Sequence, residues 1–425
     1  MSAEKVCPAL PLSALEKAKA DGGGLPKQTV FLSALVFFSM LSSTLLIPTV
    51  RSYMAHLHPG NEGAMHAFMS VNMLGAIIGA PLLCLLADRK GIRQQVILGL
   101  ALVDGALLFM LSFQMPIWLL LSLRVVQGAA NVGGLSLLMG AVSGRGKAIG
   151  MAGAALMAAV ALGAPIGTAL MNFSPLAPLR FGAALSFAIA AAMLVVKLAP
   201  VTRAPRIGFI KLLKEAPLLK VPTAFVTIER FAVGCFVVTF SLYGHRALGL
   251  GDVEVGRLFS WFLLPFAIAT YPFGRIADTV KRSTLVAAGA FTYGVAFLLL
   301  GVVPASALPV LLFVTGIASA AIYAPCLCFA STLAKPSMRS TSMSLLNAGG
   351  SLGMMIGTAT GGILSVVLQK RFAFAPESAY PLIFSVAGVS TLVVLVAFLP
   401  ALLRADTYEM EATSEKNDVK DLVPA

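Results

Sequence analysis

The sequence contains little charge and long stretches that have none. Only 12% of its 425 residues are Asp, Glu, Lys or Arg, whereas 58% are apolar. A soluble domain carries roughly 25% charged residues, so this chain cannot cover a surface that faces water. The stretches 28–50 and 63–87 lack charged residues altogether, and about 20 apolar residues suffice to cross a bilayer. These absences predict an integral membrane protein.

Other absences narrow the function. The sequence has no G-x-x-x-x-G-K-[ST] loop, which excludes a nucleotide-driven pump built from this chain alone. Clustered histidines, metal-ligand spacings and a nucleophile elbow are also missing, so neither an enzyme nor a bound cofactor is expected. The net charge of +13 comes from basic residues in short loops, which fits membrane topology better than nucleic-acid binding. The cysteines form no disulfide framework or zinc pattern: Cys7, Cys84, Cys235, Cys326 and Cys328.

Apolar runs predict twelve membrane spans in two sets of six. The N-terminal half, residues 28–198, has spans at 28–50, 63–87, 95–113, 116–141, 148–171 and 180–198. The C-terminal half, residues 222–402, has spans at 222–244, 257–277, 283–302, 308–333, 341–368 and 379–402. The uncharged stretch 283–334 is divided into two spans because Pro304 and Pro309 bracket a turn. The polar bridge 199–221 is expected to hold a helix on the membrane surface, or else a disordered basic linker.

The basic residues orient these spans. If both termini, residues 1–27 and 403–425, are cytoplasmic tails, 23 of the 31 Lys and Arg residues are cytoplasmic and 6 are external. Lys and Arg concentrate in cytoplasmic loops, so this orientation is the predicted one. The short loops favour a bacterial inner membrane.

A short charged turn occurs twice, about 190 residues apart. Residues 86–93 read L-A-D-R-K-G-I-R, and residues 276–282 read I-A-D-T-V-K-R. Each turn lies between two predicted spans, and a single repeat at this separation indicates two related halves rather than a solenoid. The predicted fold class is therefore an all-α membrane protein with twelve transmembrane helices, arranged as two six-helix pseudo-repeats.

Three motifs resemble signatures of the major facilitator superfamily. Residues 84–93 resemble its loop signature G-x-L-a-D-R-x-G-R-[RK], with Cys84 in place of the leading glycine and Ile92 in place of a basic residue. Residues 124–128, R-V-V-Q-G, are similar to its R-x-x-Q-G motif, and residues 163–167, G-A-P-I-G, to the G-P-x-x-G motif of its proton-coupled exporters. The resemblance implies a central cavity that opens alternately to either side and is lined by spans one, four, seven and ten.

Four charged residues lie within predicted spans: Asp104, Arg124, Glu229 and Arg230. Each costs about 2.5–3.5 kcal/mol at a helix centre, so each is a functional candidate. The resemblance places Glu229 beside the cavity. A carboxylate shielded from water favours its protonated form and can exchange protons near neutral pH. We expect Glu229 to couple transport to protons, with a static ion pair as the alternative.

We also assign expected roles to the other charged residues within the spans. The resemblance links Arg124, with Gln127 of the same motif, to proton transfer; the alternative is an ion pair that only fixes packing. Asp104 lies on a helix that the resemblance places outermost, so we expect it to be a structural partner of an arginine. Glu229 and Arg230 are about 100° apart around their helix, so only one is expected to face the cavity.

The two charged turns are expected to form a gate on the cytoplasmic face. Asp88 would be held by the positive end of a helix dipole, and the basic residues of its turn would pair with the other half. Asp278 marks a weaker copy, because its turn has lost the glycine that corresponds to Gly91. The alternative is that these charges only set topology. The gate residues are Asp88, Arg89, Gly91, Arg93, Asp278 and Arg282.

Small residues recur at every fourth position on spans five and eleven, where they let helix backbones approach closely. One interpretation is a sliding interface between the halves, and the other is static packing. The stripes run from Ala155 through Ala159 to Gly167 and from Gly349 to Gly361. The helix-interface residues are Gly163, Pro165, Gly167, Gly353 and Gly357.

The leading functional hypothesis is a monomeric secondary transporter that exports a small apolar or amphipathic organic molecule in exchange for protons. Its partners would be that substrate, protons and the lipid bilayer. The alternatives are uptake by proton symport or facilitated diffusion, and a non-transporting receptor or assembly factor. A copper transporter is a further alternative, because soft ligands recur at Met65, His66, Met69, Met73, Cys326 and Cys328.

Overall fold

The computed structural model describes residues 27–46, 53–54, 56, 62–142, 146–198, 217–334 and 336–421. These residues contain twelve helices of 18 residues or more and no strand. The first six are α2 (Lys27–Thr44), α4 (Glu62–Lys90), α5 (Arg93–Met110), α6 (Ile117–Ala141), α7 (Gly146–Met171) and α8 (Ala177–Val195). The second six are α10 (Lys220–Arg246), α11 (Asp252–Ile276), α12 (Arg282–Leu299), α13 (Leu308–Thr332), α14 (Arg339–Val366) and α15 (Pro376–Asp421).

The twelve helices confirm the predicted fold class. By length and composition alone, nine helical segments among the described residues qualify as membrane-crossing. The predicted break near Pro304 is present, because α12 ends at Leu299 and α13 begins at Leu308. The last helix continues to Asp421 without interruption, beyond the predicted end of its span at residue 402. Most of the bridge 199–221, and with it the predicted surface helix, lies outside the described residues. The described part of the bridge holds the 3-10 turn η1 (Pro217–Leu219) and the first two residues of α10.

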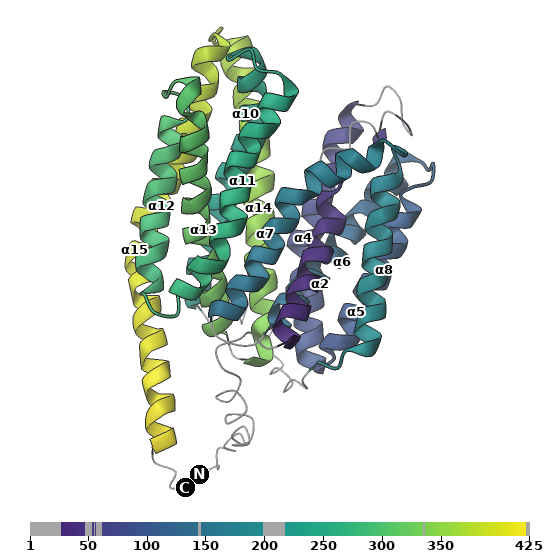
Figure 1. Ribbon diagram of the computed structural model, residues 1–425, viewed down its shortest axis with the longest axis vertical. Coiled ribbons are helices and arrows are strands. Elements are labelled where there is room, and N and C mark those ends of the chain that lie inside the picture. Colours follow the sequence, from purple (N-terminus) through teal and green to yellow (C-terminus); the bar gives the residue numbers. More distant parts are fainter. Residues whose placement is uncertain are drawn as a thin grey trace.

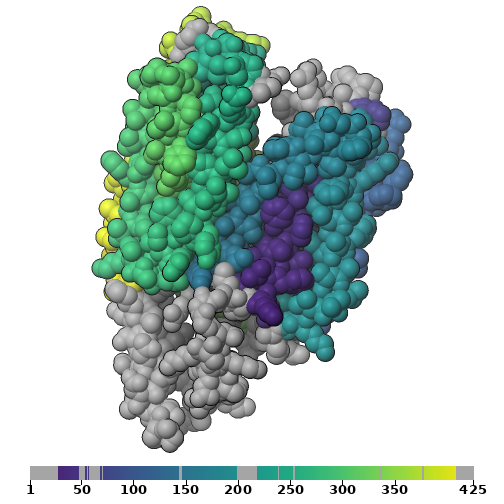
Figure 2. Space-filling model, in the orientation of Figure 1, coloured from purple at the N-terminus to yellow at the C-terminus, as the bar shows by residue number. Residues whose placement is uncertain are grey.

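The two halves lie side by side, the N-terminal one in purple and blue and the C-terminal one in green and yellow (Figure 1). Contacts between them join α4 and α6 to α14, and join α7 to α11 and α13. Figure 2 shows the halves touching at one end and hollowed between them at the other. We call the touching end, which carries Asp88, Gly146, Asp278 and Thr341, the closed end.

Glycines bring the helices of the two halves together at the closed end. A Cβ atom added to Gly150 of α7 would lie 2.7 Å from the Cα atom of Gly274 on α11. A Cβ atom on Gly140 of α6 would lie 2.6 Å from the Cα atom of Ser340 on α14. Real Cβ atoms do not approach neighbouring backbone so closely, so this interface requires glycine.

The two predicted glycine stripes pack within their own halves. A Cβ atom on Gly163 would lie 2.6 Å from the Cβ atom of Thr44 on α2, so this part of α7 faces its own half. Gly353 of α14 likewise approaches Thr227 of α10, where an added Cβ atom would lie 2.9 Å from the carbonyl carbon. The stripes are helix interfaces, but they do not form the sliding interface between the halves. That interface uses the glycines at positions 140, 150 and 274.

Replacing Gly150 by alanine is expected to weaken the closed end. The added methyl group forces α7 and α11 apart, and overpacking of this kind costs about 1–3 kcal/mol. The expected result is a lower thermal unfolding midpoint for the purified protein. Gly99→Ala is the matched control, because a Cβ atom there would meet nothing within 4 Å. Equal midpoints for the two variants would show that the halves do not need this close approach.

Candidate functional site

The carboxylate of Asp88 joins the two halves at the closed end. Its side chain is completely buried. One oxygen accepts a hydrogen bond from Nε of Arg93 at 2.6 Å. The other accepts bonds from the backbone N–H of Thr341 at 2.9 Å and from its hydroxyl at 2.8 Å. Thr341 is the third residue of α14, so Asp88 satisfies an N–H group that has no partner within the helix and lies at the positive end of the helix dipole.

Asp278 makes the reciprocal contact. Its two oxygens accept the backbone N–H groups of Gly146 at 2.6 Å and Lys147 at 3.1 Å, which are the first two residues of α7. Each half therefore supplies a carboxylate that caps a helix of the other half. Asp278 is exposed to solvent, whereas Asp88 is buried and also paired with an arginine. Both contacts join a carboxylate to the start of a helix in the other half, but only the Asp88 contact is shielded from water.

The basic residues brace the two turns. Arg93 holds Asp88 from within the same turn, and Arg282 donates from Nε to the carbonyl of Ala277 at 3.2 Å. Gly91 has a φ angle of +68°, a left-handed conformation that strains other residues. The second turn closes instead through the N–H of Val280, which donates to Ile276 at 2.9 Å. This turn needs no left-handed residue, which explains the missing glycine. Arg89 is partly buried beside Asp88.

A buried polar network occupies the N-terminal half. Nη1 of Arg124 donates to Oε1 of Gln127 at 2.5 Å, and Nε2 of Gln127 donates to Asp104 at 2.6 Å. Asp104 also accepts bonds from the hydroxyl of Ser186 at 2.6 Å and the amide of Asn131 at 3.3 Å. Gln127 thus links the cation to the anion. Although the helix of Asp104 was expected to be outermost, the carboxylate points inward between α6 and α8.

The C-terminal half carries an ion pair formed by neighbouring residues on α10. Nε of Arg230 lies 3.2 Å from Oε2 of Glu229, and the hydroxyl of Ser319 donates to Oε1 at 2.5 Å. Their positions around the helix differ, but the long arginine side chain bends back to reach the carboxylate. The sequence-based expectation that the two residues point apart is therefore only partly correct. Glu229 is fully buried towards α13, whereas the Arg230 side chain is 17% exposed.

Arg230 reaches the boundary between the halves. Its guanidinium carbon lies 5.0 Å from the ring centre of Tyr323 and 5.4 Å from that of Phe266. Nη2 lies 3.3 Å from the sulfur of Met157, which belongs to α7 of the other half. Positive charge over aromatic faces is stabilised by the ring quadrupole. The arrangement is a cation that is partly accessible and surrounded by aromatic and sulfur-containing side chains.

Comparison with known proteins identifies the family. The sequence matches the Major Facilitator Superfamily model over residues 32–245 and again over residues 223–424. The chain belongs to the major facilitator superfamily. This assignment confirms the resemblance found in the sequence, and together with the apolar helices it makes the protein an integral multi-pass membrane protein.

Two similar proteins illustrate the assignment. An uncharacterized MFS-type transporter of Methanocaldococcus jannaschii is 30% identical over 154 residues, which are 36% of this chain and 39% of that protein. The match therefore spans well under half of this relative. The crystal structure of the human organic anion transporter MFSD10 superposes with a TM-score of 0.68 at 18% identity, covering 88% of this chain and all of that one. That likeness concerns the fold.

Several hydrogen-bond partners of the buried carboxylates are neutral residues. They could not be identified from the sequence, because they carry no charge and belong to no motif. They include Thr341 at the closed end, Ser186 and Asn131 beside Asp104, and Ser319 beside Glu229. Of the residues considered for copper, Cys326 and Cys328 are buried within α13. The side chains of residues 65, 66 and 69 are outside the described part of the chain.

Asp88→Asn is expected to slow transport at least tenfold while expression stays normal. The substitution removes the charge that holds Arg93 and the N-terminus of α14, and breaking a buried ion pair costs about 3–5 kcal/mol. The measurement is initial transport rate in proteoliposomes. Asp278→Asn is the control, with a smaller expected loss because Asp278 is exposed. Unchanged transport by Asp88→Asn would rule out a gating role for this turn.

Gln127→Leu is expected to destabilise the N-terminal half. Arg124 and Asp104 each lose a hydrogen-bond partner, and leaving a buried polar group unsatisfied costs about 1–3 kcal/mol, more for a charged one. The thermal unfolding midpoint should fall. Ser122→Ala serves as the control on the same helix, because Ser122 is exposed. A midpoint equal to that of the control would show that Gln127 does not bridge the two charges.

Proposed function

We propose that the protein is a proton-coupled secondary transporter of small organic anions with an apolar body. In this proposal Glu229 carries the proton and Arg230 binds the anionic group of the substrate. The observation that carries it is the ion pair between Arg230 and Glu229, 3.2 Å apart at the boundary between the halves. Charged groups within membrane spans are costly to keep, which supports a role in the transport cycle.

The accessible member of the pair determines the substrate class. Arg230 is 17% exposed and Glu229 is completely buried, so an incoming molecule reaches the cation first. Guanidinium groups bind carboxylates and phosphates through paired hydrogen bonds. Phe266, Tyr323 and Met157 beside it suit an aromatic or aliphatic body. The solved structure that shares the fold is that of an organic anion transporter, but the proposed anion rests on Arg230.

The charges also determine the sign of coupling. Protonation neutralises Glu229 and leaves Arg230 without its counter-ion in a site of low dielectric constant. An anion then binds Arg230 more favourably, so the proton and the anion occupy the protein together. If the closed end is cytoplasmic, as the basic residues predict, this state is open to the outside. The expected outcome is uptake by symport, which was the alternative hypothesis from sequence.

Export in exchange for protons remains the second candidate. Oε2 of Glu229 accepts no hydrogen bond from the described residues and lies 3.2 Å from Nε of Arg230. A cationic substrate that displaced Arg230 would compete with a proton for this carboxylate. Competition of that kind produces antiport. The charge of the substrate therefore distinguishes the two directions.

Glu229→Gln is expected to abolish accumulation driven by a pH gradient while downhill exchange persists. The amide keeps the shape of the side chain but cannot bind or release the proton. The measurement is uptake by proteoliposomes of aromatic carboxylates and aromatic amines, with gradients of either sign. Glu254→Gln is the control, because Glu254 is exposed at the start of α11.

The sign of the gradient separates the candidates. Carboxylate uptake driven by external acid supports symport, and amine uptake driven by internal acid supports antiport. Full pH-driven accumulation by Glu229→Gln would refute the assignment of Glu229.

A further inference from the structure

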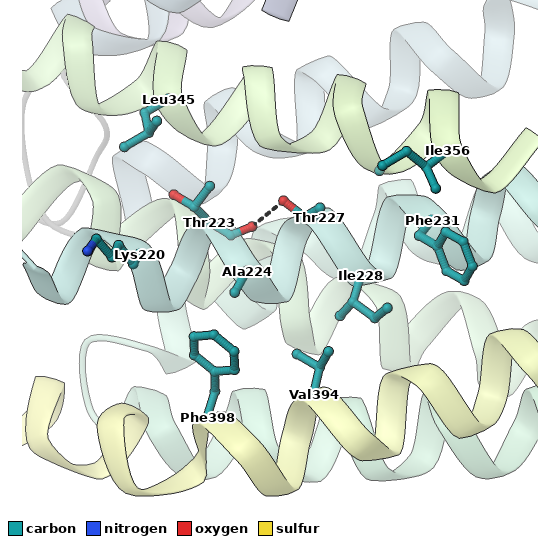
Figure 3. Close-up of a pocket in the computed structure, with 11 residues that line it drawn as sticks. Lys220, Thr223, Ala224, Thr227, Ile228, Phe231, Leu345, Ile356, Val394 and Phe398 are labelled. Carbon is teal, nitrogen blue, oxygen red and sulfur yellow. Dashed lines mark hydrogen bonds between the residues drawn. The ribbon is translucent and has the colours of Figure 1, made fainter. Parts of the chain in front are cut away.

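A groove in the C-terminal half is lined by side chains of α10, α14 and α15, and Ile356 on its wall is 46% exposed. Its volume is about 480 Å³. Figure 3 shows side chains of α14 and α15 lying on either side of α10, with Leu345 and Ile356 above and Val394 and Phe398 below. The glycine stripe explains the floor, because Gly353 lets α14 approach the backbone of Thr227.

The groove is amphipathic along its length. Lys220 is the one charged residue among those that line it and is exposed at the closed end of α10. Thr223 and Thr227 follow, and their hydroxyls donate back to carbonyls of their own helix, which leaves oxygen lone pairs free. Ile228, Phe231 and Ile356 line the other end. The site therefore suits a molecule with an anionic head and a hydrocarbon tail.

The dimensions fit one leaflet of the membrane. From Lys220 to Phe231 the helix rises about 16 Å, at 1.5 Å per residue. Half of the hydrocarbon core of a bilayer is about 15 Å thick. The cation thus lies at the level of lipid headgroups when the apolar end lies near the bilayer centre.

We propose that this groove binds one acyl chain of an anionic phospholipid, with its phosphate at Lys220. Basic pockets between membrane helices bind anionic headgroups, and a single lysine contributes a preference of roughly fivefold. Glu229 lies nine residues after Lys220, which places it about 180° away on the opposite face of α10. The bound lipid therefore packs against the face of α10 opposite to the proposed coupling pair.

The test uses tryptophan fluorescence in vesicles of phosphatidylcholine and phosphatidylglycerol, in which one lipid or the other carries bromine as a quencher. Phe398→Trp places the reporter in the groove, in a protein with Trp118 and Trp261 changed to Phe. Should that variant not fold, Val394→Trp replaces it. A protein that retains only Trp118, which is 70% exposed on α6, reports the surrounding lipid.

The proposal predicts that brominated phosphatidylglycerol quenches the groove reporter with roughly fivefold preference over phosphatidylcholine. Lys220→Gln should abolish this preference. Lys281→Gln, which removes another exposed lysine of the same half, should keep it. Equal quenching by the two lipids, a preference that survives Lys220→Gln, or the same preference at Trp118 would overturn the proposal. Absence of quenching would overturn it too, because another molecule or chain segment would then fill the groove.

Discussion

A carboxylate that is removed from water must receive hydrogen bonds from the protein, and the arrangement of the two halves depends on this constraint. At the closed end Arg93 of the same turn binds one oxygen of Asp88, whereas the donors to the other oxygen come from the opposite half, so satisfying that oxygen requires the halves to touch. Opening this end would leave one oxygen of Asp88 and the N–H of Thr341 without these partners, while Arg93 could still hold the other oxygen. After opening, these groups can form hydrogen bonds again only with water or with another part of the protein. The contact is therefore suited to a gate.

The buried carboxylate inside each half meets this requirement with different partners. In the N-terminal half, Asp104 receives three hydrogen bonds from neutral side chains and is linked to Arg124 through Gln127. In the C-terminal half, Glu229 depends on one hydroxyl and one adjacent cation. A carboxylate held by several hydrogen bonds resists change, whereas a carboxylate with few partners can exchange them. This difference favours the C-terminal half as the site of coupling.

The fold was largely predictable from the sequence, because a run of apolar residues of bilayer length leaves little choice but a membrane helix. The charges within the spans and the two charged turns could also be located, because they interrupt or separate the apolar runs. The partners were not: Asp88 and Thr341 are 253 residues apart, and nothing local to Thr341 marks its role. The glycine stripes were recognised, but periodicity shows that a helix packs closely and does not show against which neighbour. Periodicity alone could not show that Gly163 and Gly353 pack against helices of their own halves.

At the closed end, the carboxylates of Asp88 and Asp278 hold the two halves together. The most direct measurement is the distance between spin labels at Lys90→Cys and Lys281→Cys, two exposed positions on opposite halves, with the five native cysteines replaced by alanine. We predict one population of short distances in this protein. Adding Asp88→Asn and Asp278→Asn together should create a second population at longer distances. Identical distributions in the two proteins would contradict the account.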